Sequence, residues 1–215
     1  MKIGVLALQG DFEAHRKALE ACGAQVVAVR DAAALEACEA LVIPGGESTV
    51  MSRLCDRYAL WGPLLRKLES GMGVFGTCAG MIMLSRHISG ATRNFSQQTL
   101  GVMDIDVARN AYGAQVDSFE ADVTVPLLGD TPLRAVFIRA PQITRHGEAV
   151  EVLAEHAGRP VIVRQGPLLA TAFHPEIAGD IRLHRLWLEG VMTGGDSPGN
   201  HSPENRCEAG LKERD

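Results

Sequence analysis

Residues 73–84 read GVFGTCAGMIML, and this stretch indicates both the fold of the chain and its chemistry. A short apolar run followed by a longer one predicts a buried strand that turns directly into a buried helix. Cys78 lies at the turn, with Gly76 two residues before it and Gly80 two residues after it. This is the cysteine form of the G-x-S-x-G nucleophile elbow, in which the start of the helix favours a thiolate. By itself the pattern leaves two interpretations open, a catalytic nucleophile or a small cysteine packed in a core.

Apolar runs alternate with helical patterns through the first half of the chain. Strands are predicted at residues 3–8, 25–29 and 40–43, and the first of them is expected in the centre of the sheet. Helices are predicted at 12–22, around Leu35, starting at 51–54, and at 61–68. Such alternation is typical of a parallel sheet with helices on both faces. In these sheets ligands bind beyond the carboxyl ends of the strands. Both Pro44-Gly45-Gly46 and Cys78 follow strands and are expected at that edge.

The second half of the chain predicts a mixed or antiparallel extension of this sheet. Its strand-like runs lie at residues 100–107, 120–125, 134–138, 150–154, 160–165 and 168–172. Residues 182–192 predict a final amphipathic helix, with core positions at Leu183, Leu186, Trp187 and Val191. Residues 193–215 are mainly small, polar or charged, which predicts a mobile tail after a single domain at residues 1–192.

The composition is that of an ordinary globular domain. The 215 residues are 46% hydrophobic and 22% charged, which is enough for a substantial core. The net charge of −5 argues against a surface for nucleic acid or anionic membranes. No apolar run approaches the ~20 residues that span a bilayer, and the N-terminal run is too short for a signal peptide. The five cysteines form no CxxC pair, which argues against disulfides and structural zinc and indicates a reducing cytoplasm.

His174 is the best candidate for the general base that a cysteine nucleophile needs at neutral pH. It follows an apolar strand directly and precedes Pro175-Glu176. Residues two apart in an extended segment project to the same side, so Glu176 can orient the imidazole of His174. Cys78, His174 and Glu176 therefore predict a catalytic triad. The alternative is a histidine at a strand end beside a solvated glutamate.

The remaining histidines are assigned to other surroundings. His15 is predicted on a packed or half-exposed helix face, and His184 among the polar positions of the last helix. Four more lie in polar stretches and are predicted at the surface: His87, His146, His156 and His201.

Two backbone N–H groups are candidates for an oxyanion hole, because a tetrahedral intermediate needs preorganised donors. One is the N–H of Ala79, the residue after the nucleophile. The other lies in the Gly45-Gly46 pair, at Gly46, where two glycines let a peptide turn inward or outward at little steric cost. The alternative for this pair is a tight turn between a strand and a helix.

Several motifs together resemble class I, triad-type glutamine amidotransferases. The three segments that carry this resemblance are Gly76-Thr77-Cys78-Ala79-Gly80, Pro44-Gly45-Gly46-Glu47-Ser48 and Phe173-His174-Pro175-Glu176. Narrower motifs lie at residues 5–11, 109–113, 115–119 and 137–141. Over about residues 1–192 the chain resembles one family closely, the glutaminase subunit of pyridoxal 5′-phosphate synthase (the PdxT/SNO family). The resemblance implies a three-layer, flavodoxin-like α/β fold with a mixed, mainly parallel central sheet.

The resemblance also implies a reaction and a substrate site. Cys78 would attack the side-chain amide of L-glutamine, with His174 transferring the proton and Glu176 orienting it, and water would hydrolyse the resulting glutamyl thioester. The implied substrate-binding residues are Gly46, Glu47, Ser48, Arg109, Ile138 and Arg139. Glutamine carries a carboxylate, so at least one arginine or a set of N–H donors should face it. Arg109 and Arg139 are equally compatible with structural salt bridges.

The implied partner is a (β/α)8-barrel synthase subunit that receives the ammonia. The sequence contains no P-loop, metal cluster or cofactor fingerprint, so no cofactor is expected in this chain. One departure from the family is Ala114, where a basic residue is expected after Gly113, and its loss would weaken a contact to the partner.

Three other functions share parts of this pattern. A glutaminase subunit of a different amidotransferase would share the triad but not all the narrower motifs. A flavodoxin-like cysteine sensor or chaperone would use Cys78 without cleaving an amide, and would not need the base at His174. A cysteine peptidase on a related sheet is the third.

Overall fold

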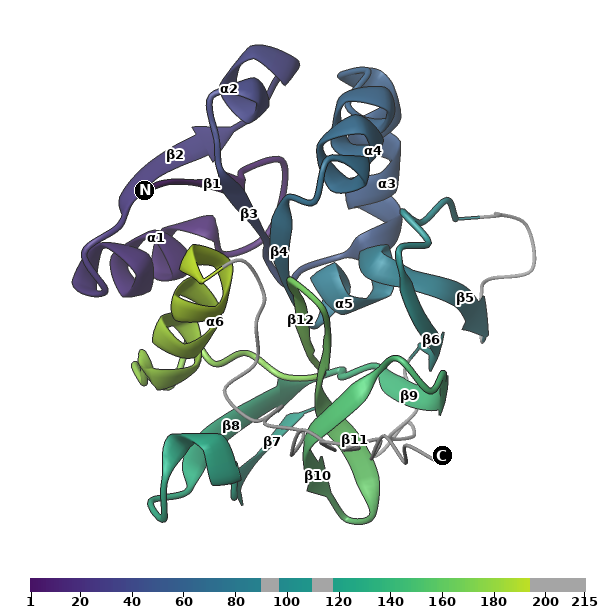
Figure 1. Ribbon diagram of the computed structural model, residues 1–215. Coiled ribbons are helices and arrows are strands. Elements are labelled where there is room, and N and C mark those ends of the chain that lie inside the picture. The colour runs from purple at the N-terminus through teal and green to yellow at the C-terminus, as the bar shows by residue number, and fades with distance from the viewer. Residues whose placement is uncertain (90–96, 110–117, 194–215) are drawn as a thin grey trace, which may run out of the picture.

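The computed structural model describes residues 1–89, 97–109 and 118–193, and its centre is a seven-stranded sheet (Figure 1). The strand order is β10-β11-β12-β4-β3-β1-β2. The strands are β1 (Lys2–Leu6), β2 (Gln25–Val29), β3 (Ala40–Ile43), β4 (Gly73–Thr77), β10 (Glu151–His156), β11 (Arg159–Gln165) and β12 (Leu168–Thr171). From β12 to β2 the neighbouring strands are parallel, whereas β10 and β11 add an antiparallel edge. The expected mixed, mainly parallel sheet is confirmed.

Helices cover both faces of this sheet and complete three layers. Figure 1 shows α1 (Phe12–Ala21) and α6 (Arg182–Met192) on one side, and α3 (Ser48–Arg57), α4 (Trp61–Glu69) and α5 (Ala79–Leu84) on the other. The short α2 (Ala32–Glu36) follows β2. Every residue of β3, β4 and β12 is buried, as expected for parallel strands covered on both faces. None of the described helices is long and apolar enough to cross a membrane.

Local sequence explains where the helices that follow the carboxyl ends of β1 and β3 begin. Asp11 caps α1, because its carboxylate accepts a hydrogen bond from the N–H of Ala14 at 3.1 Å. Glu47 caps α3, where its carboxylate accepts from the N–H groups of Thr49 and Val50. The helix predicted from residue 51 therefore starts earlier, at Ser48. At the far end of α1, Gly23 takes a left-handed φ of 85° and reverses the chain into β2.

The order of the strands differs from the expectation in one respect. The first strand, β1, was expected in the centre, but it lies next to the edge strand β2, and β4 occupies the middle of the seven. An apolar run indicates that a strand is buried on both faces, but it does not indicate the position of the strand in the sheet. The crossover connections between strands decide that position, and the sequence of residues 3–8 contains no information about them.

The strands of the second half do not all extend the main sheet. β5 (Ser85–Ser89), β6 (Met103–Ala108) and β9 (Gln142–His146) form a separate three-stranded sheet, and β7 (Ser118–Val123) pairs with β8 (Leu133–Ile138). The expected extension is thus correct only for β10, β11 and β12. β5 and β9 were not predicted, because their sequences, SRHIS and QITRH, are polar and largely exposed. A short 3-10 helix, η1 (Pro126–Leu128), precedes β8.

The final helix has the predicted bounds, 182–192, and packs its apolar side into the core. Leu183 and Trp187 are buried, and Leu186 and Val191 pack against the core cluster at partial exposure. Thr193 ends the helix. The rest of the predicted tail, residues 194–215, lies outside the described residues, as do Ala114 and His201.

Candidate active site

Cys78 lies in a sharp turn between β4 and α5, as the G-x-C-x-G pattern predicts. Its backbone is in an unusual conformation for a non-glycine residue, with φ 50° and ψ −103°. The turn is held by the Cys78 N–H, which donates to the carbonyl oxygen of Thr171 at 2.8 Å. A Cβ at Gly76 would lie 2.7 Å from the carbonyl carbon of Gly80, and a Cβ at Gly80 would overlap the carbonyl of Ile43. Both glycines are therefore required by close backbone packing.

His174 and Glu176 follow β12 and are in contact. His174 Nδ1 lies 2.8 Å from Glu176 Oε1, and the His174 N–H donates to the carbonyl oxygen of Val136 on β8 at 2.9 Å. The side chain of Glu176 is completely buried, whereas 10% of the His174 side chain is exposed. Since β12 pairs in parallel with β4, this pair reaches the same edge of the sheet as Cys78. The interpretation of a solvated Glu176 is wrong, because the carboxylate is buried.

The electrostatics of this cluster favour a charged imidazole. Burial alone would lower the pKa of His174, but hydrogen bonds to the Cys78 sulfur and to Glu176 raise it to about 10. Burial alone would raise the pKa of Glu176, but the neighbouring rings of His15 and His174 hold it well below its usual range. At neutral pH an imidazolium thus lies between a carboxylate and the sulfur of Cys78. That is the environment of a reactive cysteine.

The other described cysteines have a different character. Burial raises the pKa of the Cys22 and Cys38 thiols, and raises that of Cys55 to about 12. Those thiols therefore stay protonated at neutral pH. Cys78 is distinguished from them by the imidazolium beside it.

The Gly45-Gly46 pair lies against the base. The three atoms that a Cβ at Gly45 would meet first all belong to the His174 ring, with Nδ1 at 2.8 Å and Nε2 at 3.1 Å. Gly46 has a φ of 148° and is exposed. The next N–H, that of Glu47, donates to Gln9 Oε1 at 2.7 Å. Ala79 begins α5 beside the nucleophile, so both candidate oxyanion donors belong to segments that border Cys78 and His174.

Three of the predicted substrate residues form one polar cluster at the start of α3. Glu47 and Arg109 form an ion pair at 2.9 Å, which is the structural salt bridge considered above for this arginine. Arg109 also donates to Thr49 Oγ1 and to Gln97 Oε1, each at 2.9 Å. Ser48 donates to Gln97 Oε1 at 3.1 Å. Gln97 was not predicted, because it lies outside every motif.

The remaining two predicted residues lie at the end of β8. The carbonyl oxygen of Ile138 is 3.8 Å from Cys78 Sγ. Arg139 is exposed, and its left-handed φ of 44° turns the chain away from the strand. Among the described residues no carboxylate pairs with the Arg139 guanidinium. The small sheet of β7 and β8 thus brings a third segment to the edge of the site.

The surroundings of several histidines differ from the expectation. His184 is predicted among polar positions, but it is completely buried. His15 is also completely buried, which agrees with the packed helix face predicted for it. His15 Nδ1 lies 3.0 Å from His184 Nε2, and His15 Nε2 lies 3.4 Å from Glu176 Oε2. His156 was expected at the surface, but it is half-buried against the rings of Phe119 and Phe137.

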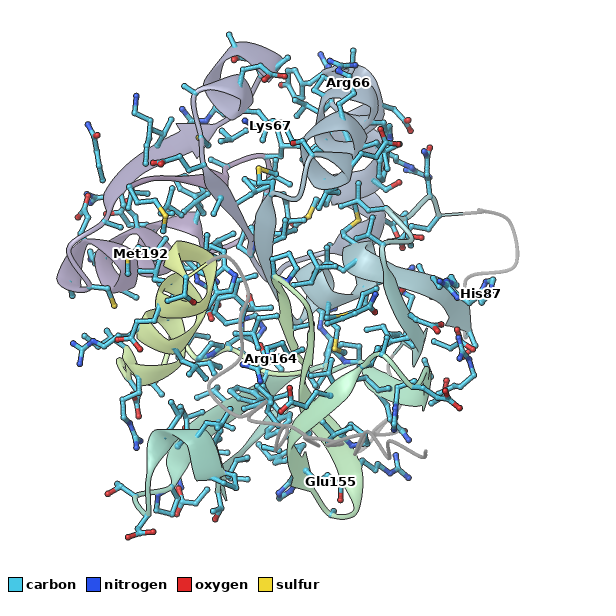
Figure 2. All side chains as sticks on the ribbon, in the orientation of Figure 1. Arg66, Lys67, His87, Glu155, Arg164 and Met192 are labelled. Carbon is cyan, nitrogen blue, oxygen red and sulfur yellow. The ribbon has the colours of Figure 1, made fainter. Side chains whose placement is uncertain are left out.

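Two surface predictions for histidines are confirmed. His87 and His146 are exposed, and Figure 2 shows His87 projecting from β5 at the periphery of the molecule. Within residues 1–89, 97–109 and 118–193, no group of His, Cys, Asp and Glu side chains is placed to hold a metal ion.

The three-layer fold and the strand-to-helix cysteine turn are those of class I glutamine amidotransferases. A crystal structure described as a glutamine amidotransferase superimposes with a TM-score of 0.81 at 46% identity, covering 88% of this chain and 98% of that one. A chain in the structure of PurLQS from Thermotoga maritima shares the fold, with a TM-score of 0.63 at 13% identity, covering 89% of this chain and 97% of that chain.

The chain belongs to the SNO glutamine amidotransferase family, whose model matches residues 5–193. It is 54% identical over 197 residues to "Pyridoxal 5'-phosphate synthase subunit PdxT" of Pelotomaculum thermopropionicum, covering 92% of this chain and 98% of that protein. The protein of the same name from Acidothermus cellulolyticus is 54% identical over 192 residues, which cover 87% of this chain and 92% of that protein.

Proposed function

We propose that this chain is the glutaminase subunit of a pyridoxal 5′-phosphate synthase and hydrolyses L-glutamine to L-glutamate and ammonia. The observation that carries the proposal is the buried His174–Glu176 pair beside Cys78. These groups converge from the ends of β4 and β12 in a chain of the SNO glutamine amidotransferase family. The comparison proteins named PdxT supply the biosynthetic context.

The first half of the reaction forms a thioester. His174 takes the proton of the Cys78 thiol before the attack, because its raised pKa favours the imidazolium, and Cys78 Sγ then attacks the carbon of the glutamine side-chain amide as a thiolate. The negative charge that develops on the amide oxygen is stabilised by the N–H groups of Ala79 and Gly46. His174 then gives its proton to the amide nitrogen, and the carbon–nitrogen bond breaks to release ammonia. Glu176 holds the Nδ1 side of the ring and stabilises its charge throughout.

The second half of the reaction regenerates the enzyme. A water molecule attacks the thioester carbon while His174 accepts one of its protons. The carbon–sulfur bond then breaks, which restores the Cys78 thiolate beside the His174 imidazolium, and the new carboxyl group loses its proton to solvent as glutamate leaves. Of the residues in this scheme, only Cys78 and His174 make or break covalent bonds.

Recognition of glutamine is assigned to the residues around this edge. Glu47 is partly exposed at the start of α3 and provides an acceptor for the α-ammonium group, while Ser48 and Gly46 border it. Arg139 is a cation with no carboxylate partner among the described residues, which suits the α-carboxylate. Arg109 orients Glu47 through their ion pair, and the carbonyl of Ile138 lies beside the reacting sulfur.

The partner in this proposal is a synthase subunit with a (β/α)8-barrel fold that consumes the ammonia. The names of the comparison proteins call each a subunit of the synthase, which supports the existence of a second subunit, and its barrel fold is part of the proposal. A cytoplasmic location and a catalytic domain at residues 1–192 belong to the same proposal.

The proposal is tested by steady-state glutamate release in the presence and absence of the synthase subunit. We expect Cys78→Ser to abolish release while its thermal unfolding transition remains cooperative, because the volume change is small. A glutamine-like electrophile should label Cys78 and spare Cys55, whose thiol is protonated. Retained activity in Cys78→Ser, or labelling of Cys55 in place of Cys78, would contradict the assignment.

The same assay separates the proposal from the rival interpretations. A cysteine sensor would react with oxidants but release no glutamate from glutamine. A glutaminase of another amidotransferase would release glutamate but would not bind the synthase subunit. A cysteine peptidase would cleave a peptide substrate but release no glutamate from free glutamine.

A further inference from the structure

A chain of buried polar groups continues beyond Glu176 on the side away from His174. Glu176 Oε1 faces His174, whereas Oε2 is buried and has no hydrogen-bond partner among the described residues, with His15 Nε2 lying 3.4 Å from it. His15 Nε2 also lies 3.1 Å from Thr77 Oγ1, directly before the nucleophile. On its other side His15 Nδ1 lies 3.0 Å from His184 Nε2. The two histidines come from α1 and α6 and pack edge-on against Phe75.

The hydrogen-bonding capacity of this chain fixes where its protons lie. His184 Nδ1 is buried and has no partner among the described residues. A buried N–H without an acceptor is costly, so we place the His184 proton on Nε2, where it can be donated to His15 Nδ1. His15 Nδ1 is then an acceptor, and the proton of His15 lies on Nε2. Thr77 Oγ1 lies 3.1 Å from that nitrogen and Glu176 Oε2 lies 3.4 Å from it.

His184 stays neutral in this arrangement. Burial lowers its pKa to about 3, and the neighbouring His15 acts in the same direction, whereas Glu176 and Asp180 oppose the shift. A neutral His184 has a single N–H. The lack of a partner at Nδ1 among the described residues therefore fixes the tautomer with the proton on Nε2.

We propose that His15, held in one tautomer by His184, is a positioning residue that anchors the inner carboxylate oxygen of Glu176. The anchor prevents the carboxylate from rotating, so Oε1 stays on His174 Nδ1 while the ring carries its proton between sulfur and nitrogen. This inference rests on the proposed glutaminase function. It assigns no chemistry to His15 itself, which does not touch the reacting atoms.

Loss of the anchor leaves a buried carboxylate oxygen without a donor. A hydrogen bond to a charged group is stronger than a neutral one, and Glu176 acts in the transition state as well as the ground state. We expect kcat to fall by about 10- to 100-fold when the donor is removed, because the imidazolium form of His174 is then less well stabilised. KM should change little, because His15 is completely buried.

A matched pair of substitutions at His15 tests the donor directly. The amide nitrogen of His15→Gln reaches about as far as Nε2 and can donate to Glu176, whereas that of His15→Asn reaches only about as far as Nδ1. Both variants are assayed in complex with the synthase subunit, and their thermal unfolding is measured alongside. We expect the glutamine variant to keep kcat within about fivefold of the parent and the asparagine variant to lose about 10- to 100-fold.

A second pair repeats the test from the other end of the chain. His184→Gln can still donate to His15, whereas His184→Leu cannot, and the same order of kcat is expected. The alkaline limb of the kcat–pH profile should move to lower pH in the two weak variants, because a less anchored Glu176 supports a less basic His174. A purely structural role would lower stability without moving this limb.

The outcomes separate the two proposals. If the parent complex releases no glutamate from glutamine, the proposed function fails, and this inference fails with it. If the parent is active but both members of each folded pair have the same kcat and the same pH profile, the glutaminase assignment stands and the anchoring role of His15 is refuted.

Discussion

A single methyl group at Gly45 is expected to disable the site while leaving the fold largely intact. The Cβ of Gly45→Ala would lie 2.8 Å from His174 Nδ1 and 3.1 Å from Nε2, and closer still to Cε1 between them. An ordinary carbon contact is about 3.5–4.0 Å, so the ring would have to move by about 1 Å or more. Gly45 has no left-handed φ, so the perturbation is the collision with the ring and not backbone strain.

The ring cannot move that far without losing a contact. Its Nδ1 is bonded to Glu176 at 2.8 Å, and the backbone N–H of His174 is held by the carbonyl oxygen of Val136 at 2.9 Å. A misplacement of about 1 Å can cost about 10²-fold in rate, and a general base contributes about 10²–10⁴-fold. We therefore expect kcat of Gly45→Ala to fall by about 10²- to 10³-fold. Overpacking should lower the free energy of unfolding by only about 1–3 kcal/mol.

The assay is glutamate release by the complex with the synthase subunit, combined with urea unfolding of the isolated chain. Gly190→Ala in α6 is the matched control, because a Cβ there meets nothing within 4 Å. The control should keep full activity and gain about 0.5–1 kcal/mol in unfolding free energy. A folded Gly45→Ala variant with kcat within threefold of the parent would refute the placement of this loop against His174.

Further predictions address the triad, the elbow and the pH dependence of stability. His174→Asn should lose nearly all glutaminase activity, and Glu176→Gln less, because an amide can still hold the ring but cannot stabilise its charge; equal losses in kcat would contradict these roles. Gly80→Ala should lower the urea midpoint of unfolding by far more than Gly45→Ala, because its Cβ meets backbone at Ile43; an unchanged midpoint would contradict the close packing of the elbow. For His184 the folded pKa is lowered, so its contribution to stability is present above about pH 6.5 and is lost as the pH falls toward 3. Between pH 6 and 5 urea unfolding should show a loss of about 1.4 kcal/mol per pH unit from this group, a slope that His184→Gln should flatten.

The sequence predicts those helices and strands that are marked by their own apolar pattern. It does not predict features that depend on pairing between segments far apart in the chain. The strands at 25–29 and 40–43 and the helix at 182–192 have the predicted bounds, since each is marked by its own apolar pattern and its own stop. The position of β1 in the sheet and the separation of β5, β6 and β9 from the main sheet are decided by pairing between segments far apart in the chain. No run of residues in β5 or β9 encodes that pairing.

The candidate site divides in the same way. The spacing of Gly76, Cys78 and Gly80 predicts the elbow, and the spacing of His174 and Glu176 predicts their contact, because both relations act over a few residues. The contact between Gly45 and His174 joins the segment after β3 to the segment after β12. Nothing in the sequence of either segment predicts how close the two residues lie.

His184 nevertheless carries a signal that helical periodicity can detect. It lies three and four residues before Trp187 and Leu188, which are buried, so its side chain must project from the same face of α6. His15 stands in the same relation to Ala18 and Leu19 on α1, which lies beside α6. A histidine at a core position needs a hydrogen-bond partner, because an unpaired buried polar group is costly. Two such histidines on adjacent helices therefore predict contact with each other and with a third buried polar group, and Glu176 is the buried carboxylate that the sheet brings within reach.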